Sequence, residues 1–196
     1  MKEITSIKNH IKNHNLATNS LDLSILEKII DEIFNCFKKG NKLLICGNGG
    51  SAADAIHLAG EFMCIGLPAI ALAENISTVT AIGNDYNYYS IFDAQINVFA
   101  KENDVLLLLS TSGDSFNIIK AARIGKDKKC KVICFTGLNP DYKLEEYSNY
   151  IIKIQSFKTE IIQEVYYMIN HIIYITIRER LKWTMKNVYQ KEINIG

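Results

Sequence analysis

The chain has little of several features that mark particular protein classes. Its 196 residues include only two prolines, with no linker-like stretch and no internal repeat, so we expect one domain with its own core. Basic and acidic residues nearly balance at a net charge of +1, which argues against a nucleic-acid-binding surface. The most apolar run, residues 165–177, is too short and interrupted to span a bilayer. We therefore expect neither a nucleic-acid partner nor a membrane partner.

Cysteine is present but does not suggest disulfides. The five cysteines are odd in number and irregularly spaced, which does not fit a disulfide framework. Cys46, Cys130 and Cys134 lie in or beside apolar runs, so we expect them to be small buried hydrophobic residues. The first 20 residues are polar and lysine-rich, unlike a signal peptide. These features predict a protein of the reducing cytoplasm.

Short apolar runs alternate with helical periodicity, a pattern typical of an α/β fold with a parallel sheet covered on both faces. Strands are expected at residues 42–47, 68–73, 104–109, 130–136 and 150–154. Helices are expected at residues 2–15, 21–39, 51–64, 76–83, 88–99, 115–127 and 142–147, and from 159 past 181. One domain then comprises N-terminal helices (2–40), a sheet core (41–155), a C-terminal helix (158–181) and a tail (182–196).

The segment 47–61 (GNGGSAADAIHLAGE) leaves an apolar strand, crosses three glycines in four residues and enters a helix. Helix N-termini attract anions, and glycine lets the backbone approach a ligand closely. The segment is neither a P-loop nor a dinucleotide fingerprint, and an ordinary tight turn remains the alternative. His57 and Glu61, four residues apart, share one face of the helix. The segment suggests chemistry on a small phosphorylated molecule.

A second strand, near residues 104–109, runs into the hydroxyl-rich segment STSGDS. Ser110, Thr111, Ser112 and Ser115 could hold a phosphate without a cation, because hydroxyls and backbone N–H groups both donate hydrogen bonds. Helix capping by Ser112 or Asp114 is the plainer alternative, although it accounts for only one or two of these side chains. Parallel strands bind ligands at their carboxyl ends, so both segments are expected on one side.

Together the segments 48–54, 57–61, 80–85, 110–115 and 162–164, followed by His171, resemble a phosphoheptose isomerase of the sugar isomerase (SIS) fold over roughly residues 20–181. The resemblance implies an SIS-type doubly wound sandwich with a central five-stranded parallel sheet flanked by helices. It implies conversion of D-sedoheptulose 7-phosphate to D-glycero-D-manno-heptose 7-phosphate for lipopolysaccharide or capsule heptose. It also implies a homotetramer with active sites at subunit contacts.

Ketose–aldose isomerisation moves a proton between adjacent carbons through an enediol, and so needs a base, an acid and a grip on the phosphate. By the resemblance Glu61 is the candidate base and His171 the candidate acid. Glu61 is also expected to contact substrate, with the sugar and phosphate contacts falling to Asn48, Gly49, Gly50, Ser51, Asn84, Asp85, Ser110, Thr111, Ser112, Ser115 and Gln163.

The resemblance also implies one zinc ion per subunit, held by His57, Glu61, Gln163 and His171. Only the His57–Glu61 spacing suggests a metal by itself, since Gln163 and His171 are separated by about 12 Å of helix rise. Without the resemblance, His57 would be read as a helix histidine bonded to a backbone carbonyl. His171 would be read as a packed core histidine.

The chain departs from the family pattern at positions expected to lie near the phosphate of the substrate. Residues 61–68 lack the expected arginine, and Ile161 replaces the arginine that usually precedes the Ile-Gln-Glu motif. Lys158 could supply one charge, whereas Asp114 would repel a phosphate if it pointed inward. Two alternatives therefore stay open: an isomerase of another phosphosugar, or a non-catalytic SIS scaffold that binds the replication initiator. Retention of Glu61 and His171 favours the enzyme.

Overall fold

The computed structural model describes residues 2–139 and 143–182, so the expected tail lies outside the described residues except for Lys182. Five strands form one parallel sheet, as predicted, and the structure shows their order to be β2-β1-β3-β4-β5. The strands are β1 (Leu43–Gly47), β2 (Ala69–Ala71), β3 (Val105–Ser110), β4 (Lys131–Thr136) and β5 (Tyr150–Lys153). Each lies within a residue or two of its expected bounds.

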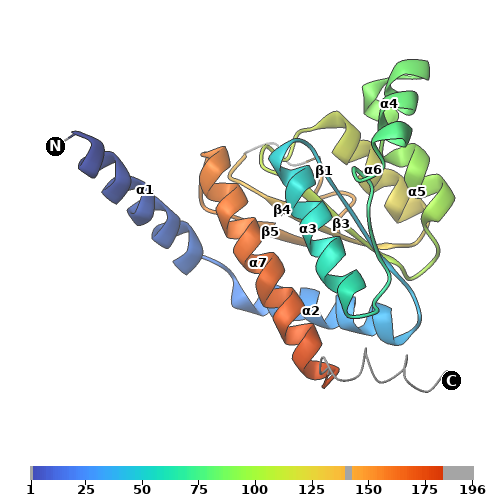
Figure 1. Ribbon diagram of the computed structural model, residues 1–196, viewed down its shortest axis with the longest axis horizontal. Coiled ribbons are helices and arrows are strands. Elements are labelled where there is room, and N and C mark those ends of the chain that lie inside the picture. Colours follow the sequence, from blue (N-terminus) through green and yellow to red (C-terminus); the bar gives the residue numbers. More distant parts are fainter. Residues whose placement is uncertain (1, 140–142, 183–196) are drawn as a thin grey trace, which may run out of the picture.

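Helices cover both faces of the sheet (Figure 1). One face packs on α2 (Leu23–Lys38), α3 (Gly50–Cys64) and α7 (Thr159–Arg180), and the other packs on α5 (Asp93–Phe99) and α6 (Phe116–Asp127). The remaining helices are α1 (Lys2–Asn19), α4 (Ile76–Asp85) and the short 3-10 helix η1 (Tyr88–Ser90). No helix among the described residues is long and apolar enough to cross a membrane.

The strands are apolar along their whole length because both faces are covered. In β3, Val105, Leu107 and Leu109 enter the core under α2, α3 and α7, whereas Leu106 and Leu108 enter the core under α5 and α6. The two cores follow from the two-residue side-chain period of a strand. Cys46, Cys130 and Cys134 are buried and unpaired, as expected, and burial raises the pKa of the Cys134 thiol to about 12.

Two expected helices differ from the structure. The helix expected at 88–99 is interrupted between η1 and α5, where the Gln95 side chain donates hydrogen bonds to the carbonyls of Ile91 and Leu72. In the segment expected to be helical at 142–147, the described residues 143–147 form turns. Leu144 is fully buried there, and this one anchor is too little to stabilise a helix.

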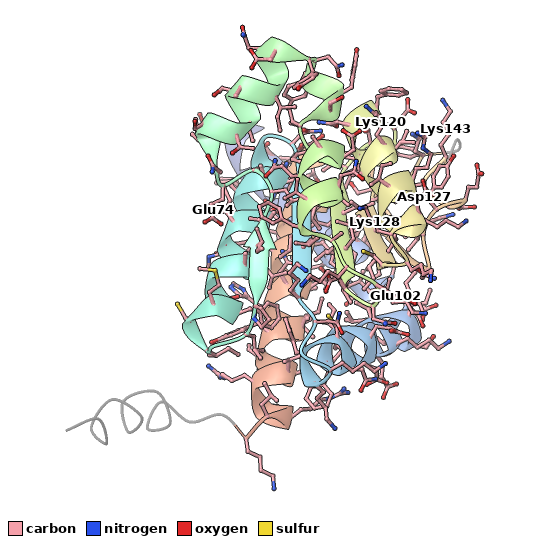
Figure 2. The ribbon with its side chains drawn as sticks, turned by 90° about the vertical axis from the view of Figure 1, so that its right-hand side faces the viewer. Glu74, Glu102, Lys120, Asp127, Lys128 and Lys143 are labelled. Carbon is pink, nitrogen blue, oxygen red and sulfur yellow. The ribbon has the colours of Figure 1, made fainter. Side chains whose placement is uncertain are left out.

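Two helices extend away from the sheet (Figure 1). α1 projects at one side and exposes Ile4, Ile7 and Ile11, which recur at helical spacing, while α4 has no buried residue. A hydrogen bond of 2.8 Å between His10 and Glu164 ties α1 to α7. By contrast, the outer face of α5 and α6 carries charges of both signs (Figure 2).

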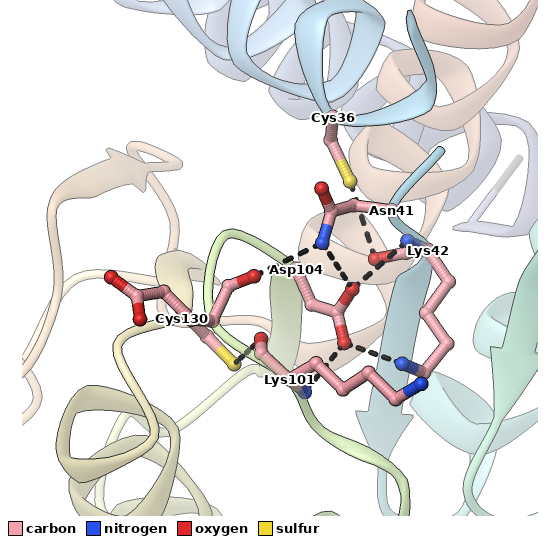
Figure 3. Close-up of polar contacts among 7 residues, drawn as sticks. Cys36, Asn41, Lys42, Lys101, Asp104 and Cys130 are labelled. Carbon is pink, nitrogen blue, oxygen red and sulfur yellow. Dashed lines mark hydrogen bonds and ion pairs between the residues drawn. The ribbon is translucent and has the colours of Figure 1, made fainter. Parts of the chain in front are cut away.

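Asp104 ties the sheet together at the amino ends of its strands (Figure 3). Its carboxylate is buried and accepts hydrogen bonds from the backbone N–H groups of Lys42 and Lys101, from the Asn41 amide, and from the Lys42 ammonium at 2.5 Å. Burial alone would raise the pKa of Asp104, but these hydrogen bonds together lower it. This cluster lies at the edge opposite the candidate site and is structural.

Candidate active site

The two segments singled out in the sequence meet at the carboxyl ends of β1 and β3. They line a cavity of about 290 Å³. The N-termini of α3, α6 and α7 all contribute to its wall, and each helix start carries partial positive charge. The lining residues are Asn48, Gly49, Gly50, Ser51, Leu109, Ser110, Thr111, Ser115, Thr159 and Gln163. We call this cavity the anion cup, because helix N-termini and hydroxyls are suited to binding a phosphate.

Only some of the hydroxyls around the cup make hydrogen bonds within their own loop. Ser110 accepts a hydrogen bond from the N–H of Gly113, and Ser112 accepts one from the N–H of Asp114. Ser115 is the N-cap residue of α6 but makes no side-chain cap bond. In the described residues the hydroxyls of Thr111 and Ser115 have no partner of their own. Capping therefore leaves donors available to a ligand. Asp114 is exposed and does not line the cup.

Asn48 is held rigidly at the edge of the cup. It exchanges two hydrogen bonds of 2.9 Å with the buried Asn117 amide, and its carbonyl oxygen also accepts the Tyr88 hydroxyl at 3.0 Å. Its side-chain oxygen is thus fully used within the protein, and one amide hydrogen is left to face a sugar. Asn117 and Tyr88 are the residues that position it.

His57, Glu61 and His171 come together between α3 and α7. The Nε2 atoms of the two histidines are 3.2 Å apart. One carboxylate oxygen of Glu61 is 3.8 Å from His57 Nε2, and the other is 3.8 Å from His171 Nε2. The histidine side chains are 40% and 37% exposed, so His171 is not a packed core histidine. His57 bonds to side chains rather than to a backbone carbonyl.

These three side chains fit a metal ion. One ligand atom from each lies within 4.8 Å of the other two, and Glu61 Oε2 is buried without a hydrogen-bond partner. Two facing imidazole nitrogens and an unsatisfied carboxylate oxygen are an arrangement that a cation would satisfy. Two histidines and a carboxylate are also a known catalytic zinc set, with a fourth position left open.

Gln163 lies elsewhere in this conformation. Its amide atoms are 2.6–2.8 Å from the position that a Cβ on Gly50 would occupy, and it lines the anion cup. Gly50 and His57 are separated by seven residues of α3, or about 10 Å of helix rise. The structure therefore places Gln163 with the phosphate-side residues, apart from the three that could hold a metal.

Several expected contributors lie outside the cup. Asn84 and Asp85 end the projecting helix α4, where they are exposed and bonded to each other. Lys158 lies in a neighbouring hollow rather than in the cup, and Ile161 is fully buried in the core. No lining residue of the cup carries a cationic side chain. The missing arginines are not replaced within the described part of the chain around this cavity.

Sequence reasoning missed four residues: Thr159 in the cup wall, Asn117 and Tyr88 behind Asn48, and Tyr167 beside the histidines. Only Tyr167 had a readable signal, because it lies four residues from both Gln163 and His171 on α7. Asp54, which lies on α3, is distinguished by a shifted pKa. Burial raises the pKa of its carboxyl to about 6, against the opposing effect of the His57 charge.

Comparisons with known proteins agree with this fold and site. The SIS domain family matches residues 9–137, and the chain belongs to that family. A phosphoheptose isomerase of Aneurinibacillus thermoaerophilus is 40% identical over 187 residues, covering 89% of this chain and 93% of the relative. One from Synechocystis sp. is 42% identical over 162 residues, covering 80% and 83%.

A solved structure supports the same relationship. The phosphoheptose isomerase of Neisseria gonorrhoeae superposes with a TM-score of 0.85 at 30% identity, covering 91% of this chain and 97% of that one. The particular group within the SIS family is therefore that of the phosphoheptose isomerases, and the chain is a phosphosugar isomerase. The scaffold alternative is set aside.

Proposed function

We propose that this enzyme converts D-sedoheptulose 7-phosphate to D-glycero-D-manno-heptose 7-phosphate through an enediol. The supporting observation is the spacing of the site. The anion cup and the His57–Glu61–His171 group lie on one side of α3, about two helical turns apart. A substrate that reaches both needs several carbons between its phosphate and its carbonyl. A heptose 7-phosphate meets that requirement.

The proton-transfer roles follow from the two residue types. Glu61 takes the proton from the carbon next to the carbonyl, and the same proton or a solvent proton returns to the neighbouring carbon. His171, whose Nε2 is 3.8 Å from the Glu61 carboxylate, exchanges a proton with the sugar oxygen through the ring nitrogen that zinc would leave free. The cup holds the phosphate, so that the reacting carbons stay within reach of both groups. Ser110, Thr111 and Ser115 in the cup are the proposed phosphate contacts, with Ser112 in an adjoining hollow that shares Thr111. Asn48, Gly49, Gly50, Ser51 and Gln163 lie nearby.

The proposal includes one zinc ion per subunit, held by His57, Glu61 and His171. When bound, zinc would supply Lewis-acid polarisation of the sugar carbonyl. Glu61 has two oxygens facing different histidines, so binding an ion through one oxygen leaves the other for the proton. Gln163 could join the set only after leaving Gly50.

We further propose a homotetramer. Ile4, Ile7 and Ile11 are each more than half exposed on α1, and α4 buries no residue. Exposed apolar surface of this kind marks a contact with another protein surface. Neighbouring subunits would also bring Asn84 and Asp85 toward a cup from which they are remote within one chain. Sedimentation measurements should give a tetramer, and a stable, fully active monomer would contradict this.

The destination of the product is proposed as lipopolysaccharide or capsule heptose, made in the reducing cytoplasm. An isomerase of another phosphosugar is the second candidate. It is favoured by one observation, the absence of a cationic side chain among the residues lining the cup.

The assay offers the protein sedoheptulose 7-phosphate, fructose 6-phosphate and arabinose 5-phosphate, with and without added zinc, and follows product by NMR. We expect turnover of the heptose alone. Glu61→Gln and His171→Gln should each lose roughly 10²–10⁴-fold in kcat while the fold persists. Normal turnover by both variants would overturn the role assignments. Preference for a shorter sugar would establish the second candidate.

A further inference from the structure

Tyr167 touches both histidines of the candidate metal set. Its ring stacks on His57 with centroids 4.9 Å apart and planes 28° apart, and it meets His171 edge to face at 4.5 Å and 77°. Its hydroxyl is 3.2 Å from His57 Nε2, the same nitrogen that faces His171. One side chain thus contacts two imidazoles whose residues, on α3 and α7, are 114 positions apart in sequence.

The two histidines have few other restraints. In the described residues the imidazole of His57 makes hydrogen bonds only to Tyr167 and His171, and its side chain is 40% exposed. An exposed histidine on a helix surface ordinarily samples several rotamers. A stacked aromatic ring and a hydroxyl contact restrict that sampling before any ligand arrives, and groups around metal ligands tune metal affinity in this way.

We propose that Tyr167 is the positioning residue of the metal site. Its ring holds the two imidazoles with their Nε2 atoms directed at one point beside Glu61, whereas its hydroxyl contacts His57 Nε2 in the metal-free site and gives up that contact when an ion takes the nitrogen. This inference rests on the zinc site of the proposed function and adds a residue outside the ligand set. It acts through His57 and His171, and it takes no proton from the substrate.

Tyr174 offers a matched control. It lies on the same helix, three residues beyond His171, and packs edge to face on Phe62 of α3 at 5.9 Å. Like Tyr167 it joins α7 to α3 through an aromatic contact, but it has no ring contact or hydrogen bond with either histidine among the described residues. Its removal should weaken helix packing without altering the imidazoles.

The experiment compares wild type, Tyr167→Phe, Tyr167→Leu and Tyr174→Leu as metal-free protein titrated with zinc against a chromogenic chelator. Tyr167→Leu should weaken zinc binding by roughly 10–100-fold, the usual effect of losing a group that orients a ligand. Tyr167→Phe, which keeps the ring and removes only the hydroxyl that competes for His57 Nε2, should bind zinc at least as tightly as wild type. Tyr174→Leu should lower the melting temperature and leave the zinc affinity unchanged.

Cobalt substitution gives a second readout that general destabilisation does not move. The visible absorption bands of bound cobalt report ligand geometry, and they should shift in Tyr167→Leu but match wild type in Tyr174→Leu. Wild-type affinity and spectrum in Tyr167→Leu would overturn the positioning role and leave the metal site standing. If wild type binds neither zinc nor cobalt, both this inference and the zinc part of the proposed function fail, while the substrate assay still judges the isomerase reaction.

Discussion

The side-chain amide of Gln163 occupies the space that a Cβ on Gly50 would need. Atoms of that amide lie 2.6–2.9 Å from the position of such a Cβ, closer than real contacts allow. Because Gly50 opens α3 and Gln163 belongs to α7, this one missing methyl group lets the two helices share the wall of the anion cup.

Gly50→Ala should therefore damage the site while sparing the fold, because the displaced group is the flexible end of a side chain. We expect kcat/KM to fall roughly 10–100-fold, the value of a hydrogen bond to a charged ligand, with KM rising most. The measurement is steady-state kinetics beside a thermal melt.

Gly60 is the control, since it lies on the same helix with nothing within 4 Å of an added Cβ. Gly60→Ala should keep its activity and gain up to about 1 kcal/mol of stability from better helix propensity. Equal kinetics in the two variants would show that the place of Gln163 does not matter.

Asn117→Asp should disturb the position of the Asn48 side chain. The substitution sets a carboxylate oxygen against the Asn48 carbonyl oxygen, where an amide N–H now donates at 2.9 Å. Because Asn117 is buried, we expect a loss of about 1–3 kcal/mol in the free energy of unfolding together with lower kcat/KM. Asn97→Asp, at an exposed position on α5, should change neither quantity. An unaltered kcat/KM in Asn117→Asp would show that Asn117 does not support the site.

Asp104→Asn should destabilise the sheet by about 3 kcal/mol, because it leaves the partly buried Lys42 side chain without its counter-charge. Since the pKa of Asp104 is lowered on folding, its contribution is present above its ordinary pKa near 4 and is lost as the pH falls below it. Urea unfolding should show the two proteins converging in acid. Glu102→Gln, which breaks an exposed pair with Lys129, should cost almost nothing, and a similar cost for both would refute the assignment.

Asp54 should change the stability with pH in the direction opposite to that of Asp104. Its pKa is raised to about 6 on folding, so the folded protein holds this proton more tightly than the unfolded chain does. The stability that it contributes is complete below about pH 4 and is lost as the pH rises through 6. Asp54→Asn should abolish that decline in metal-free protein and be the more stable form at pH 8. Asp127→Asn, on the exposed face of α6, should show the same dependence of the free energy of unfolding on pH as wild type. The same dependence in Asp54→Asn would contradict the proposed role of the Asp54 proton.

Sequence patterns of short range determined the local features of this protein. The apolar runs predicted all five strands, and the four-residue spacing put His57 and Glu61 on one face of α3. These features follow from the periods of helix and strand, which act within a few residues. The break between η1 and α5 escaped prediction because a contact beside it, the hydrogen bond from the Gln95 side chain to the Leu72 carbonyl, spans 23 residues.

Only the tertiary structure decided which distant side chains meet. The packing of α7 beside α3 brings His171 to His57, places Tyr167 against both histidines and seats Gln163 against Gly50, whereas α4 carries Asn84 and Asp85 away. The reason is that the registry of two packed helices depends on the sheet beneath them and on side chains at the crossing, neither of which any local spacing encodes. The sequence specified the chemical groups, and the fold selected which of them share a site.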